Sequence, residues 1–71
     1  MMIEEFHTAK QMTAVRLDDV QIVEFVDGVV SPYVSFKFRS GQYEEVFAEG
    51  DVPGLLDFYK RVVHGMKSGE R

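Results

Sequence analysis

The sequence predicts an α+β fold, in which an antiparallel meander of three to four strands packs on one C-terminal α-helix. Two turn signals, Asp-Gly at 27–28 and Ser-Gly at 40–41, separate runs of apolar residues in the middle of the chain. Helical periodicity follows over 52–68. We therefore expect a single small domain over 1–71, with the meander over 12–49 and the helix over 52–68.

The first hairpin is predicted from Asp27-Gly28, which lies between QIVEFV and VVSPYVSFKF. Both central positions of a type I′ turn need positive φ, and Asp-Gly meets that need. A two-residue turn here places Phe25 opposite Val30. Successive strand residues point to opposite faces, which puts six apolar side chains on one face: Val23, Phe25, Val30, Val34, Phe36 and Phe38.

The second hairpin, which turns at 40–41, allows two registers. A two-residue turn places Lys37 opposite Glu44, a favourable cross-strand ion pair. The same register places Glu45 beside Phe36 on the apolar face, where a carboxylate is unfavourable. A bulge at the turn would move Glu45 off that face, so both registers remain open.

A second apolar face is predicted from the strand-like stretch MTAVRL at 12–17. A tight turn at 18–19 pairs Leu17 with Val20 and places six apolar side chains on the sheet face turned away from the helix: Val15, Leu17, Val20, Ile22, Val26 and Val29. Soluble monomers rarely expose so large an apolar patch. We expect a homodimer or a protein partner on this face, or else cover from 1–11, which forms a short helix or an extended arm.

The C-terminal helix has a capping residue and a continuous apolar arc. Asp51 is a suitable N-cap, and Pro53 lies in the first turn, where its missing N–H has no cost. Asp57 and Arg61 have the favourable i, i+4 order. The apolar arc, which we expect to cover the phenylalanine face of the sheet, contains Leu55, Leu56, Phe58, Tyr59, Val62, Val63 and Met66.

Composition and charge narrow the class of protein. The 71 residues are 45% hydrophobic, carry a net charge of −4 and contain no cysteine, which indicates a globular chain without disulfides. Acidic residues outnumber basic ones in 1–51, whereas 52–71 is mildly basic. General nucleic-acid affinity needs a concentrated positive footprint, which this distribution lacks. The absence of a signal-peptide pattern or long apolar run leads us to expect a cytoplasmic protein without membrane contact.

Residues suited to catalysis are sparse. His7 and His64 have no carboxylate or second histidine at the spacing of metal ligands, and neither a nucleophile elbow nor a phosphate loop is present. We expect no enzyme activity, no bound metal and no cofactor. In the run FKFR at 36–39, alternation sends the phenylalanines to one face and the cations to the other, which favours core packing over base stacking.

The function expected from these observations is protein–protein interaction through an acidic surface. Such a surface suits an inhibitor or regulator of a basic, nucleic-acid-handling protein, by analogy with small proteins encoded by phages and mobile elements. The predicted partner-binding residues are Asp18, Asp19, Glu24, Asp27, Glu44 and Glu49. The alternative is a small nucleic-acid-binding module that uses Lys37, Arg39, Lys60 and Lys67.

Overall fold

The structure is a computed structural model that describes residues 2–28 and 30–68. Its elements in chain order are β1 (Ile3–His7), β2 (Met12–Arg16), the short 3₁₀ turn η1 (Leu17–Asp19), β3 (Val20–Val26), β4 (Tyr33–Phe38), β5 (Tyr43–Phe47) and the helix α1 (Val52–Ser68). The predicted α+β class, with a strand meander and one C-terminal helix packed on it, is confirmed.

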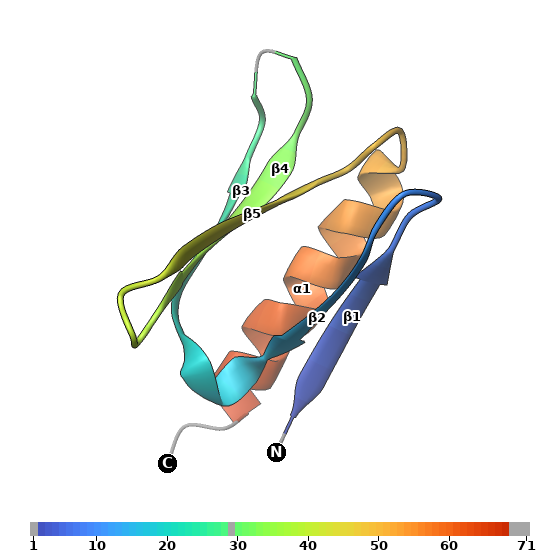
Figure 1. The fold of residues 1–71 in the computed structure, drawn as a ribbon. Helices are drawn as coiled ribbons and strands as arrows, with labels where there is room; N and C mark the ends of the chain where they lie inside the picture. Colours follow the sequence, from blue (N-terminus) through green and yellow to red (C-terminus); the bar gives the residue numbers. More distant parts are fainter. Residues whose placement is uncertain (1, 29, 69–71) are drawn as a thin grey trace.

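The described strands form two antiparallel sheets. Strands β1 and β2 form a hairpin, and β3, β4 and β5 form a meander with β4 in the centre. Figure 1 shows α1 running along both sheets, with the hairpin on one side of it and the meander on the other.

The N-terminal segment is extended and not helical, one of the two conformations expected for it. It is the strand β1, which pairs with β2 in a register that places Phe6 opposite Thr13. Strand β2 was expected to join the meander through a tight turn at 18–19, which was wrong. The turn η1 directs the chain out of the hairpin and into the second sheet, and Leu17 donates its backbone N–H to the Met2 carbonyl (3.0 Å) instead of pairing with Val20.

The turn between β3 and β4 is longer than the predicted two-residue turn. Phe25 lies opposite Val34 and not opposite Val30, which is 99% exposed. The chain continues past Asp-Gly as far as Pro32, which has no N–H to contribute to a ladder at this point. The predicted pairing is therefore displaced by four residues. Because four is an even number, Val34 and Phe36 remain on the predicted face of the sheet.

A β-bulge between Val20 and Ile22 divides the predicted second apolar face. Val20 turns into the core and is 2% exposed, whereas Ile22 turns outward and is 46% exposed. Val15 and Leu17 are also buried in that core, because the N-terminal hairpin folds against α1. The predicted grouping on one outward face was therefore wrong for the set Val15, Leu17, Val20, Ile22, Val26 and Val29. Of its last two members, Val26 is half-buried and Val29 lies outside the described residues.

One core joins the two sheets to the helix. The Phe58 ring lies 5.6 Å from Phe6 of β1 and 6.0 Å from Phe36 of β4, between ring centroids. The predicted helix face is confirmed except at Leu56, which is 37% exposed: Leu55 and Val62 are fully buried, and Tyr59 and Met66 are half-buried and pack on the core. The core residues are Phe6, Val15, Leu17, Val20, Val34, Phe36, Val46, Ala48, Leu55, Phe58 and Val62.

Polar contacts hold the helix at its start and along its length. The Asp51 carboxylate accepts the backbone N–H of Gly54 (3.0 Å), as the predicted N-cap requires. Arg61 makes the predicted ion pair with Asp57 and also donates to the Glu4 carboxylate (2.9 Å) and the Glu5 backbone carbonyl (3.1 Å). Arg61 therefore ties α1 to β1.

Candidate protein-binding face

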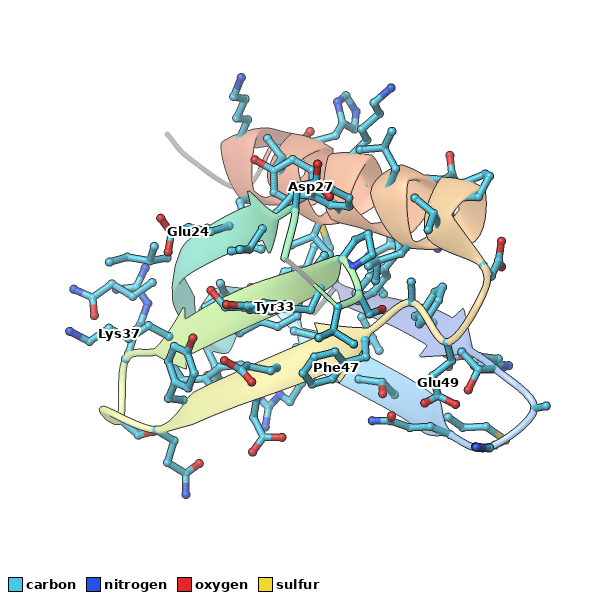
Figure 2. All side chains as sticks on the ribbon, turned by 90° about the horizontal axis from the view of Figure 1, so that it is seen from above. Glu24, Asp27, Tyr33, Lys37, Phe47 and Glu49 are labelled. Atoms are coloured by element: carbon cyan, nitrogen blue, oxygen red, sulfur yellow. The ribbon has the colours of Figure 1, made fainter. Side chains whose placement is uncertain are left out.

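The candidate site is the face of the β3–β4–β5 sheet that is turned away from α1. The strand register arranges nine side chains there in three rows across the strands, because directly paired residues share a face. We call this surface the outer sheet face (Figure 2). Its rows are Val26, Tyr33 and Phe47; Glu24, Ser35 and Glu45; and Ile22, Lys37 and Tyr43.

Large apolar side chains are exposed on the outer sheet face. The Tyr33 and Phe47 rings pack on each other with centroids 5.2 Å apart, and Phe47 remains 41% exposed. Tyr43 is 57% exposed, and Ile22 lies in the same row. No described element covers these side chains, and exposed aromatic side chains are enriched at protein interfaces.

Two carboxylates lie between the apolar rows. Glu24 and Glu45 flank the buried Ser35, and none of the ion pairs among the described residues involves either of them or Lys37. Tyr43 donates its hydroxyl to the Glu45 carboxylate (3.1 Å). Although a contact with the Ser35 hydroxyl lowers the Tyr43 pKa, desolvation and the Glu45 carboxylate together raise it. Tyr43 therefore stays a neutral donor near pH 7 and orients Glu45.

The predicted acidic set is divided between two places. Glu24 lies on the outer sheet face, and Asp27 and Glu49 lie near its edges (Figure 2). Glu44 lies on β5 opposite Phe36, so its side chain is on the other face of the sheet. Asp18 and Asp19 lie in the turn η1, which precedes β3 and is not part of the three rows.

The two aspartates of η1 lie close to arginines. Asp19 pairs with Arg16 at 3.7 Å, and the Asp18 backbone carbonyl accepts from the Arg39 side chain at 3.1 Å. Arg16 therefore offsets the Asp19 carboxylate, and Arg39 adds positive charge beside the turn, so η1 presents less net negative charge than the sequence suggests.

The cations of the nucleic-acid alternative do not form one tract. Lys37 lies on the outer sheet face, and Arg39 contacts η1. Lys60 and Lys67 are exposed on α1, which packs on the opposite side of the sheet.

Four residues of the site were missing from the predicted partner-binding set: Tyr33, Tyr43, Glu45 and Phe47. The predicted register of the second hairpin placed Glu45 on the inner face of the sheet. Residues 43 and 47 share a face with Glu45, so the same register placed them inward too. In the structure Lys37 lies opposite Tyr43, so the register differs by one residue, as the bulge alternative allowed. The sequence contained one indication of the correct register, the apolar Val46. If the Val46 side chain points into the core, residues 43, 45 and 47 must point outward.

The histidines require one correction. The His7 Nε2 atom lies 3.0 Å from the Glu5 carboxylate, a pair at i, i+2 on one face of β1 that the sequence reading overlooked. Both side chains are more than half exposed. Within residues 2–28 and 30–68, no group of three or more histidines and carboxylates is arranged to hold a metal ion.

A groove runs between β2 and β5, on the other side of β5 from the outer sheet face. Two adjoining hollows of about 380 and 290 Å³ share Ala14, Val15 and Phe38 in their walls. Val46 and Glu44 contribute from β5. The groove is thus apolar along its floor and has a carboxylate on its β5 side.

Comparison of the chain with protein-family models, curated proteins and solved structures gives no significant match. Among the described residues, no helix has both the length and the apolarity that crossing a bilayer requires. The candidate site is therefore defined by geometry and charge alone.

Proposed function

We propose that this chain is a protein–protein interaction module that binds a basic partner through the outer sheet face. One observation carries the proposal: exposed aromatic side chains and carboxylates without ion-pair partners are interleaved on a single rigid sheet. Aromatic residues supply large contact area at low entropic cost and dominate the energy of many protein interfaces.

The outer sheet face carries two carboxylates, Glu24 and Glu45, against one ammonium group, Lys37, and this negative balance favours a partner rich in arginine or lysine. Guanidinium and ammonium groups interact favourably with the faces of tyrosine and phenylalanine rings, and they pair with carboxylates. Tyr33 and Phe47 offer the rings, and Glu24 and Glu45 offer the carboxylates one row away. The same partner group can therefore contact both.

The role that follows is inhibition or regulation of a nucleic-acid-handling protein. Basic surfaces of such proteins hold phosphate backbones, and an acidic module that occupies the surface competes with the nucleic acid. The excess of acidic side chains over 1–51 supports this role, because that segment contains the outer sheet face.

The experiment is affinity capture from the source organism, followed by calorimetry with the isolated partner. Phe47→Ala combined with Glu24→Lys should weaken binding at least about tenfold, since it removes one aromatic anchor and reverses one charge. Lys60→Ala combined with Lys67→Ala, on the opposite side of the molecule, is the matched control and should bind as wild type. The loss should be larger at 50 mM than at 300 mM salt.

Titration with single- and double-stranded oligonucleotides tests the alternative directly. The proposal expects no binding at micromolar concentration in low salt. Micromolar binding that the Lys60→Ala and Lys67→Ala changes abolish would contradict it, because a protein partner would then be unnecessary.

A further inference from the structure

The hydrogen bonds at the two ends of β5 define which of its backbone groups face β4. The Phe38 N–H donates to the Gln42 carbonyl (2.9 Å), and the Ala48 N–H donates to the Pro32 carbonyl (3.2 Å). The register between these ends is uninterrupted. Bonded and non-bonded pairs alternate along an antiparallel ladder.

It follows that Glu44 and Val46 direct their backbone groups toward β4, whereas Tyr43, Glu45 and Phe47 direct theirs away from the sheet. The backbone groups of these three residues have no partner strand within the described part of the chain. Strand β5 also contains no proline, lysine or bulge, which are three of the features by which proteins block an exposed edge. It does carry the carboxylates of Glu44 and Glu45, and this charge disfavours pairing with an acidic strand.

The same alternation applies to β2. Thr8 donates to the Gln11 carbonyl (2.7 Å) at one end of the hairpin, and Leu17 donates to the Met2 carbonyl (3.0 Å) at the other. Alternation between these ends directs the backbone groups of residues 12, 14 and 16 away from β1. Ala14 and Arg16 line the groove, so this second edge faces it too.

The other two outer edges of the sheets are next to the helix. On β1, the Glu5 carbonyl accepts a hydrogen bond from Arg61. On β3, Phe25 packs against Tyr59 of α1, with ring centroids 5.9 Å apart. The edges of β2 and β5 are left facing one groove, with no described element between them.

We infer that this groove is a strand-docking site, and that an extended segment of the partner pairs with the edge of β5. That the partner is basic comes from the proposed function, on which this inference rests. The new element is that the partner binds through a segment in extended conformation. An added strand supplies hydrogen bonds to residues 43, 45 and 47 and extends the meander to four strands.

The segment that fits has apolar and basic residues in alternation. Side chains turned inward enter the hollow whose apolar walls are Val15, Phe38 and Val46, which suits valine or leucine, with the Glu44 carboxylate beside them on β5. Side chains turned outward lie beside Glu45 and the aromatic residues of the outer sheet face, which suits arginine or lysine.

Charge favours a basic segment over a second copy of this chain as the occupant. Antiparallel pairing of β5 with its own copy over 43–47 places Glu45 directly opposite Glu45 of the second copy. Like charges in directly opposed positions destabilise a strand pair. A basic segment replaces that repulsion with an ion pair.

The probe for the test is a synthetic, end-capped eight-residue peptide that alternates valine and arginine. Nuclear magnetic resonance should show slowed amide exchange at Tyr43, Glu45 and Phe47 when the peptide is added, because their N–H groups become bonded. The amides of Glu44 and Val46, already bonded to β4, should change little. In the antiparallel arrangement the arginine N–H groups point to β5, so N-methylation of the arginines should abolish binding.

Substitutions at Glu45 separate the backbone contribution from the charge. Glu45→Pro removes an N–H that no described strand uses, so the fold should survive while peptide affinity falls at least about tenfold. Glu45→Gln retains the N–H and should lower affinity by no more than about threefold at 150 mM salt.

Each contrary result has a defined meaning. Undiminished binding of the N-methylated peptide would overturn strand docking without any change to the protein, and dimerisation of the wild type through β5 would overturn the choice of occupant. If the captured partner binds Glu45→Pro as well as wild type but loses affinity for the Phe47→Ala and Glu24→Lys combination, strand docking fails and the proposed function stands. If neither variant loses affinity for the partner, both fail.

Discussion

The two faces of the β3–β4–β5 sheet are formed by alternate residues of the same strands, yet their surroundings differ completely. On the inner face Val34 and Phe36 are fully buried beneath α1. On the outer face Tyr43 and Phe47 remain about half exposed. The contacts that stabilise the fold are therefore on one face, and aromatic residues on the other contribute less to stability and are available for binding.

The strand edges show the same contrast. The edge of β1 is closed by Arg61, which donates to the Glu5 carbonyl, whereas the edge of β5 faces an open groove. In a chain of 71 residues one helix can cover only part of the strand perimeter. Strand β5 contributes both to the uncovered face and to an uncovered edge, which makes this strand the centre of the binding hypotheses.

The largest expected effect tests the bulge that separates the two faces. Val20→Glu should unfold the protein, because an unpaired carboxylate in the core costs several kcal/mol and a domain of this size has only about 3–5 kcal/mol of stability. Ile22→Glu, two residues along the same strand, should keep the fold and change stability by less than about 1 kcal/mol. Circular dichroism during urea unfolding measures both. Equal damage from the two changes would show that β3 has no bulge.

A smaller effect is expected from the helix side of the core. Val62→Ala should lower the free energy of unfolding by about 1–3 kcal/mol, since Val62 is fully buried. Val52→Ala, an exposed position on the same helix, is the matched control and should change stability by less than about 0.5 kcal/mol. A loss below about 0.5 kcal/mol for Val62→Ala would show that this helix face is not core.

The smallest effect concerns the closed edge of β1. Arg61→Gln should lower stability by about 1 kcal/mol, because its contacts with Glu4 and Glu5 are partly exposed. Hydrogen exchange should become faster in β1 than in β4. Lys60→Gln, with no ion pair among the described residues, should leave both rates unchanged. Uniform acceleration across the protein would mean that Arg61 does not act through the β1 edge.

The candidate site was only partly predictable from the sequence. Glu24 and Asp27 were expected at a partner surface, and the structure places both on or beside the outer sheet face. The aromatic residues were not expected there, because a register error of one residue exchanges the two faces of a strand. The first hairpin shows the opposite case. Its predicted pairing of Phe25 with Val30 was displaced by four residues, and an even displacement left the faces of Val34 and Phe36 unchanged.

The sequence by itself determined the helix, because its cap, its apolar arc and the Asp57–Arg61 pair are all local signals read within a few turns. It also determined that Val34 and Phe36 are inward, since alternation along one strand is local too. Only the tertiary structure decided the partner of β2, because the choice between β1 and β3 depends on how η1 directs the chain. Whether Val15, Leu17 and Val20 form a surface or a core was decided there as well. Burial depends on which distant segments meet, and one extra residue in a bulge or a single 3₁₀ turn is enough to change that.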